Sequence, residues 1–222
     1  ICSDKTGTLT QNRMTVIYAE AAGQQVNLDE PTASIAGYPL SLLLTGGALC
    51  NDAMLKRDDK GQWQVVGDPT EGALGLAAAR FELVPEQLQT QWPRVAEIPF
   101  ESDRKRMTTI HHLAEATQLL ELAPQLAGHA KHATHLAFTK GSVDGLLDIS
   151  ESVLTDDGLQ PLTAERRQSL EAANDQLAGN GIRVLGLGLR LLTQPNLAAT
   201  AEEVEQKLTF VGLVGMIDPP RP

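Results

Sequence analysis

The sequence lacks the long apolar runs, the positive charge and the cysteine patterns that mark several classes of protein. Its longest apolar stretch, residues 41–49, contains two glycines and is far shorter than the roughly 20 residues that a membrane helix needs. The formal net charge is −10, so the surface should repel nucleic acid, although a small anion needs only a local basic pocket. The two cysteines show no CxxC or His/Cys spacing and are expected to be reduced cytosolic thiols.

The chain has only 4% aromatic residues, but 42% of its 222 residues are hydrophobic, which is enough for one core, or for one core plus a fragment of a second domain. Strands are predicted at residues 14–20, 25–28, 63–66, 95–100, 106–113, 135–139, 182–191 and 208–217. Helices are predicted at residues 39–51, 70–81 (capped by Thr70), 86–92, 143–149 and 163–177. Because the strands follow one another directly, we expect an α/β (α+β) fold with a mostly antiparallel sheet flanked by helices. The Ala/Leu/His-rich segment before residue 135 is expected to be a surface excursion.

The strongest chemical signal is CSDKTGTLT at residues 2–10. An aspartate that leaves a buried strand into a Thr/Gly loop can attack a phosphoryl group, so Asp4 is the expected nucleophile, with Lys5 and loop N–H groups holding phosphate oxygens. Many phosphatases with an aspartate nucleophile place a second Asp two residues later to speed hydrolysis, and here that position is Thr6. Asp4 should therefore hold its phosphate for another process to use. An isolated polar turn with an Asx cap is the alternative, but the nine-residue pattern extends well beyond such a turn.

Residues 2–16, CSDKTGTLTQNRMTV, resemble the phosphorylation loop of P-type cation-transporting ATPases. Four further motifs of that family follow in the expected order: GDPTE at 67–71, FESDRKRM at 100–107, KG at 140–141 and DPPR at 218–221. The resemblance covers the whole chain. It is very specific at the first and last motifs and moderate in between.

The resemblance implies a nucleotide-binding domain inserted into a haloacid-dehalogenase-like phosphorylation domain. Residues 1–13 would then be the first piece of the phosphorylation domain, residues 14–214 the nucleotide-binding domain, and residues 215–222 the return into the phosphorylation domain. The hinge would include Asp218, Pro219 and Pro220, because proline stiffens the backbone. Since both ends of the sequence fall inside such motifs, we expect the chain to be a piece of a larger protein.

The resemblance also implies a nucleotide site. Phe100 would stack on the adenine and Lys105 would line the pocket, roles that suit an aromatic face and a nearby ammonium. Lys140 would border the adenine pocket, and Gly141, at a helix start, would let the nucleotide approach the backbone. Glu71 would accept a hydrogen bond from the adenine amino group.

Arg183 resembles the family's arginine that reaches the β-phosphate, where a guanidinium can fork onto phosphate oxygens. Ser102 stands where family members often carry a basic residue, so the phosphate contact that this basic residue would make is not expected here. Each site residue has a plainer alternative. Phe100 could lie in the core with Lys105 in a solvated charge run, and Lys140-Gly141 could be a strand-to-helix turn. Glu71 could be a helix N-terminal acid, and Arg183 a surface arginine at a strand edge.

The histidines invite a metal site, but the sequence argues against one. His129, His132 and His135 are spaced by three, which does not keep three ligands on one helix face, and no cysteine or acidic partner is close. Together with His111 and His112, they are expected to be solvated residues of a surface insertion.

The resemblance thus implies an enzyme, a membrane cation pump that ATP phosphorylates on Asp4, with Mg²⁺ held by Asp4 and the Thr6 backbone. No histidine precedes a proline, as one does in heavy-metal pumps, and the flanking motifs resemble the type II group. Calcium is therefore the first expectation for the ion, with sodium, potassium or proton transport as alternatives. The chain alone should bind ATP without turnover, as a monomer. The rest of the phosphorylation domain, the actuator domain and transmembrane helices would be its partners in one polypeptide, in a bacterial plasma membrane.

Two other classes of protein remain as alternatives. One is a soluble aspartate-nucleophile phosphatase or phosphotransferase of the haloacid dehalogenase superfamily, which Thr6 and the large insertion after the loop disfavour. The other is an interaction module without nucleotide, which the Phe100, Lys105 and Lys140 motifs disfavour.

Overall fold

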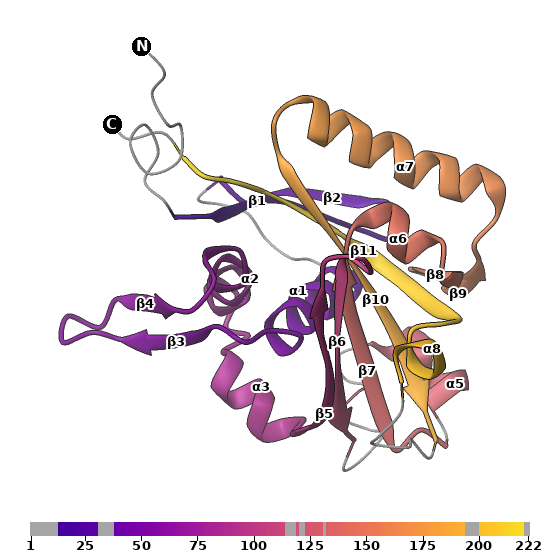
Figure 1. The fold of residues 1–222 in the computed structure, drawn as a ribbon, viewed down its shortest axis with the longest axis horizontal. Helices are drawn as coiled ribbons and strands as arrows, with labels where there is room; N and C mark the ends of the chain where they lie inside the picture. Colours follow the sequence, from indigo (N-terminus) through magenta and orange to yellow (C-terminus); the bar gives the residue numbers. More distant parts are fainter. Residues whose placement is uncertain are drawn as a thin grey trace.

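A computed structural model describes residues 13–30, 38–113, 119, 123–130, 132–193 and 200–219. Nine of its strands form one sheet, in which β2, β1, β11, β10, β7, β6 and β5 are neighbours in that order, β8 pairs with β11 and β9 pairs with β8. Every pairing is antiparallel except that of β8 with β11. Figure 1 shows helices on both sides of this sheet. The predicted fold class, a mostly antiparallel sheet flanked by helices, is confirmed.

The strands are β1 Thr15–Ala21, β2 Gln24–Asn27, β3 Met54–Arg57, β4 Trp63–Val66, β5 Arg94–Glu101, β6 Arg106–His112, β7 His135–Gly141, β8 Ser150–Thr155, β9 Gly158–Pro161, β10 Arg183–Leu192 and β11 Leu208–Ile217. All eight predicted strands are present, with ends that shift by at most two residues. The sequence patterns missed β3, β8 and β9. Strands β3 and β4 form a separate hairpin, which projects from the body of the domain in Figure 1.

The helices are α1 Tyr38–Leu49, α2 Pro69–Arg80, α3 Pro85–Gln91, the 3-10 turn η1 Pro124–Leu126, α5 Ala127–Ala130, α6 Val143–Leu147, α7 Ala164–Gly179 and α8 Ala201–Val204. The five predicted helices correspond to α1, α2, α3, α6 and α7. Among the described residues no helix is long and apolar enough to cross a membrane.

Strand β11 lies at the centre of the fold because its sequence, LTFVGLVGMI, is apolar on both faces. Val211, Val214 and Met216 are buried in the larger core, which α1, α2 and α3 complete on one face of the sheet. Leu208 and Phe210 are buried in a second core, which α6 and α7 cover on the other face. A strand that is buried on both faces reads as a continuous apolar run, as this one does.

Helix α7 covers the second core with one stripe only. No α7 residue is fully buried, and the three that pack against the core, Leu170, Ala173 and Leu177, are those that the sequence placed on one face. The helix begins after Thr163, whose side chain accepts from the Arg166 N–H at 3.3 Å. It continues two residues beyond the predicted end and stops at Gly179.

The segment before β7 is a correction to the predicted surface excursion. Four of its described apolar side chains are fully or almost fully buried in the larger core, namely Leu119, Ala123, Leu126 and Ala130. Alanine and leucine at these positions add to the core because η1 and α5 fold against the sheet.

His111 is a second correction, because it is fully buried rather than solvated. Its Nδ1 lies 2.9 Å from the Trp92 carbonyl oxygen and its Nε2 lies 2.9 Å from the Thr109 hydroxyl. Since a carbonyl can only accept, Nδ1 carries the proton and Nε2 accepts from Thr109. Burial, together with the charge of Arg94, lowers the pKa of His111 to about 4. His112 on the same strand is exposed.

This burial predicts a loss of stability in mild acid. The folded-state pKa of His111, about 4, lies below its ordinary value of 6.5, so the unfolded chain binds more protons between these two pH values. The free energy of unfolding should therefore fall as the pH drops from 6.5 to 4, with about 3 kcal/mol of this loss due to His111. Urea unfolding across this range measures the slope.

The matched variants are His111→Gln and His112→Gln. The first removes the buried titrating group, so its stability should depend less on pH in this window. The second removes an exposed neighbour on β6 and should keep the slope of the parent chain. Equal slopes for His111→Gln and the parent would contradict the assignment.

Candidate functional site

A pocket of about 570 Å³ opens at one end of the sheet, where β5 and β7 end and β10 begins, beside the start of α2. Its volume lies in the range of small-molecule sites, which is about 300–1,000 Å³. The lining residues are Asp68, Thr70, Glu71, Leu74, Phe100, Lys105, Lys140, Gly141, Ser142, Arg183, Val184 and Leu185.

The structure places all six sequence-predicted nucleotide residues on this lining, although they come from four separate segments of the chain. Six further lining residues were not predicted. Asp68, Thr70 and Ser142 lie inside or next to the motifs already recognised, so their positions carried a signal. Leu74, Val184 and Leu185 had only an ordinary helix or strand pattern.

Phe100 presents its ring to solvent at the mouth of the pocket. It is 64% exposed near the end of β5, which rules out the alternative that it is a core residue. A large exposed aromatic side chain beside a pocket is the type of surface that stacks on a flat ligand.

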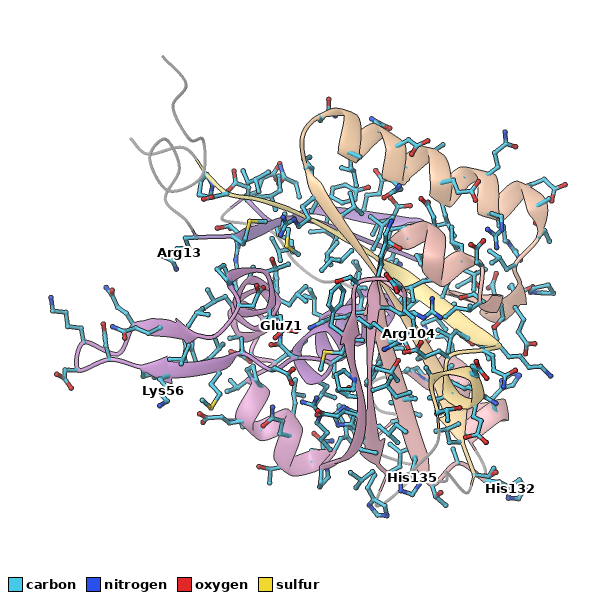
Figure 2. All side chains as sticks on the ribbon, in the orientation of Figure 1. Arg13, Lys56, Glu71, Arg104, His132 and His135 are labelled. Carbon is cyan, nitrogen blue, oxygen red and sulfur yellow. The ribbon has the colours of Figure 1, made fainter. Side chains whose placement is uncertain are left out.

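Glu71 and Lys140 form an ion pair inside the pocket, between Glu71 Oε1 and Lys140 Nζ. The second carboxylate oxygen, Oε2, accepts from the Asp52 N–H at 3.0 Å, and the Glu71 carbonyl accepts from Asn51 Nδ2 at 2.7 Å. Glu71 is therefore held from the loop after α1 as well as from β7, and it lies in the middle of the molecule in Figure 2. Both of its carboxylate oxygens have partners before any ligand arrives.

The cap of α2 is Asp68, which corrects the prediction that Thr70 caps this helix. Asp68 Oδ1 accepts from the Thr70 N–H at 2.8 Å and from the Glu71 N–H at 3.1 Å. The reason is Pro69: the residue before a proline is pushed to extended backbone, and proline itself suits the first helical position. Asp68 has that extended conformation, with φ −64° and ψ 132°.

Gly141 is required by the packing of β7 against the turn that precedes β6. A Cβ at this position would lie 2.6 Å from both the Lys105 carbonyl oxygen and the Arg106 Cβ. The next residue, Ser142, donates its N–H to that same carbonyl at 3.2 Å. The absence of a side chain therefore lets the floor of the pocket close against the turn that carries Lys105.

Arg183 connects the far wall of the pocket to α2. Its Nη1 donates to the Thr70 hydroxyl at 3.0 Å. The lining holds three cations, Lys105, Lys140 and Arg183, against the carboxylates of Asp68 and Glu71. On a chain of net charge −10, this is a local basic environment that an anion can use.

Most of the predicted catalytic and hinge residues are not among the residues that the structure describes. Asp4, Lys5, Thr6 and Pro220 fall outside the described residues. Where the chain leaves the sheet, β1 and β11 pair as far as Thr15 and Ile217, and the Arg13 N–H donates to Asp218 Oδ1 at 3.2 Å.

A mostly antiparallel sheet with helices on both faces and a basic pocket at the strand ends defines an α/β domain with a candidate small-molecule site. Comparison with known proteins specifies it further: a family model described as "P-type ATPase, cytoplasmic domain N" matches residues 39–222. The chain therefore belongs to the P-type ATPase cytoplasmic domain N family.

Its relatives carry names of transport proteins. The chain is 38% identical to "Cation-transporting ATPase pma1" of Synechocystis sp., 35% identical to "Calcium-transporting ATPase 1" of Bacillus cereus and 32% identical to "Calcium-transporting ATPase" of Bacillus subtilis. Each match covers 100% of this chain but only 24%, 22% and 24% of the respective relative. The chain thus spans about a quarter of the length of these proteins.

The close approach at Gly141 predicts that Gly141→Ala destabilises the domain. The added methyl group would force β7 away from the turn before β6, and overpacking of this kind costs about 1–3 kcal/mol. The free energy of unfolding in urea measures this loss. Gly179→Ala is the control, because a Cβ there meets nothing within 4 Å, and it should be neutral or slightly stabilising. Equal stability of the two variants would contradict the packing argument.

Proposed function

We propose that the pocket binds ATP and that the chain is the ATP-binding domain of a membrane cation pump. The observation that carries this proposal is the exposed Phe100 ring at the mouth of a pocket of about 570 Å³ that Lys105, Lys140 and Arg183 also line. An aromatic face suits a base, and the cations suit a triphosphate. Family membership and the names of the relatives support the same proposal.

In the proposed complex the adenine stacks on Phe100 and its amino group donates to the Glu71 carboxylate. A carboxylate offers about four lone-pair sites, so Glu71 can accept from a base while it keeps Lys140 and the Asp52 N–H. Arg183 then faces the β-phosphate, and Lys105 offsets the nucleotide charge. Gly141 lets the ligand lie close to the backbone.

Phosphorylation of Asp4 is proposed for the whole polypeptide. Thr6, in place of a second aspartate, supports an intermediate that persists long enough to drive cation transport, for which calcium is the first candidate because several relatives are named for it. Mg²⁺ would spread the charge of the transferred phosphoryl group. Its proposed ligands are Asp4 and the Thr6 backbone, which the described residues do not include.

The proposed domain division has residues 1–13 and 215–222 in the phosphorylation domain and 14–214 in the nucleotide domain, with a hinge at Asp218, Pro219 and Pro220. Strand β11 continues to Ile217, so residues 215–217 also pair within the sheet. The pairing of Thr15 with Ile217 holds the two proposed connections between the domains side by side, an arrangement that suits a hinge. The other proposed partners are the actuator domain and the membrane helices of the same polypeptide.

The chain is predicted to bind ATP weakly and without a need for Mg²⁺, because the base contacts dominate. An ATP titration into the millimolar range, followed by amide NMR shifts, tests this. Shifts should gather at Glu71, Phe100 and Lys140, whether or not Mg²⁺ is present. No shifts at these residues at millimolar ATP would contradict the proposed function.

Among the pocket residues, Phe100→Ala should weaken ATP binding more than Arg183→Ala. Loss of stacking costs about 1 kcal/mol, or about fivefold in Kd, whereas Arg183 is exposed and its charge is screened. Calorimetric or NMR titrations compare the two variants. Met54→Ala is the matched control, because Met54 is also an exposed apolar side chain, at 55%, but does not line the pocket. The reverse order of the two pocket variants would disprove the stacking role.

In the full-length polypeptide, Asp4→Asn should abolish labelling of the protein by ATP that carries a radioactive γ-phosphate, because an amide cannot serve as the nucleophile. ATP binding to the cytoplasmic domain should persist in this variant. Acid-stable labelling that survives the substitution would show that another residue accepts the phosphate.

A further inference from the structure

Outside the pocket, Glu205 is a fully buried carboxylate with an unusual set of partners. It follows α8 and precedes β11, and its side chain is 0% exposed. Arg104 Nη1 donates to both of its oxygens at 2.7 Å, and Arg106 Nε donates to Oε2 at 2.6 Å. The Thr108 hydroxyl donates to Oε1 at 2.9 Å. One buried anion thus binds two arginines that are two residues apart.

These two arginines flank Lys105, which is one of the pocket residues. The turn between β5 and β6 places Lys105 at φ +51°, a left-handed conformation that costs a non-glycine residue free energy and persists only where its surroundings impose it. The Lys105 N–H donates to the Glu101 carbonyl at 2.8 Å, and its own carbonyl accepts from Ser142. Glu205 constrains the residues on both sides of Lys105, because it binds both Arg104 and Arg106.

The same network extends to the segment that carries Phe100. Arg104 Nη2 donates to the Pro99 carbonyl at 2.8 Å, and Arg104 Nε donates to Glu101 Oε2 at 2.7 Å. The residues immediately before and after Phe100 are therefore tied to a guanidinium that Glu205 anchors. In Figure 2, which keeps the orientation of Figure 1, Arg104 lies close to the position where Figure 1 labels α8.

The energetics favour a role in positioning over a role in stability alone. A buried ion network contributes little net stability compared with an apolar core, but removing one partner leaves uncompensated charge behind. Here, loss of Glu205 would leave two guanidiniums of like charge, each with a side chain only 19% exposed, next to each other. The turn that presents Phe100 and Lys105 would then have to rearrange.

We infer that Glu205 is a positioning residue of the ATP pocket, which it shapes from outside by holding Arg104 and Arg106 and, through them, the turn that bears Phe100 and Lys105. This inference rests on the proposed binding of ATP. It adds a residue that touches no nucleotide and that follows Arg104 by about a hundred residues in the sequence.

The test compares Glu205→Gln with Glu202→Gln in this chain. Both remove one negative charge from the same short segment, but Glu202 is exposed and does not line the pocket. Glu205→Gln should weaken ATP binding about fivefold, the size of a lost aromatic stack, and should speed hydrogen exchange at the Lys105 amide. Glu202→Gln should leave both unchanged.

A coupling measurement separates positioning from a general loss of stability. In a Phe100→Leu background, Glu205→Gln should weaken ATP binding by less than about twofold, because the stacking that it supports is already reduced. An equal effect in both backgrounds would overturn the inference in favour of a merely structural role. Parent-like affinity and parent-like Lys105 exchange in Glu205→Gln would overturn it directly.

Two further outcomes are decisive. If the parent chain fails to bind ATP, the proposed function fails, and unchanged Lys105 exchange in Glu205→Gln would then overturn the role in the turn as well.

If Glu205→Gln does not fold, Arg104→Met takes its place, because it keeps the apolar stem and leaves Glu205 paired with Arg106. Arg104→Met should weaken ATP binding about threefold, and an unchanged Kd would overturn the inference.

Discussion

The structure depends on the burial of β11 on both faces. One edge of this strand pairs with β10 along almost its whole length. Its other edge is shared: residues 208–210 pair with β8, and residues 212–217 pair with β1. Because apolar side chains point to both sides, two cores form against the same strand, and the helices of either face pack onto them.

The pocket follows from where the strands stop. The strands β5 and β7 end, and β10 begins, at the same end of the sheet, and α2 starts beside them. The side chains at these ends are not needed for the core, so they can be an exposed aromatic ring, two lysines and an arginine. Binding residues placed on strand ends and turns over a rigid sheet are a common arrangement, because the scaffold fixes them while leaving them accessible.

Local patterns in the sequence predicted the fold class, whereas a resemblance to P-type ATPases singled out the six residues that the structure places on one pocket. Alternation and apolar runs predicted eight strands, and short motifs placed Glu71, Phe100 and Lys140 on segments that the fold then brings together. What was missed depends on contacts between distant segments. The short strand β8 is stabilised by pairing with β11, and His111 is buried by the sheet and by Trp92, neither of which a local pattern reports.

The same limit applies within the site. The Asp68 cap is predictable from the sequence, because Pro69 restricts the residue before it to extended backbone. Glu205 carried no such signal, because a glutamate near a short helix is ordinary until Arg104 and Arg106 are seen beside it. Contacts between residues of one motif can be predicted from the sequence, whereas contacts between distant segments, such as those of Glu205 with Arg104 and Arg106, cannot.

The ion pair between Glu71 and Lys140 has a consequence for how the pocket exchanges its ligand. In the absence of a ligand the Lys140 ammonium already occupies one oxygen of the carboxylate, and the Asp52 N–H occupies the other. An incoming hydrogen-bond donor would therefore use a lone pair that these two partners leave free, on a carboxylate whose charge Lys140 already balances. The empty pocket therefore holds no unpaired carboxylate at Glu71, and a new donor would gain less from Glu71 than from a carboxylate without a cation beside it.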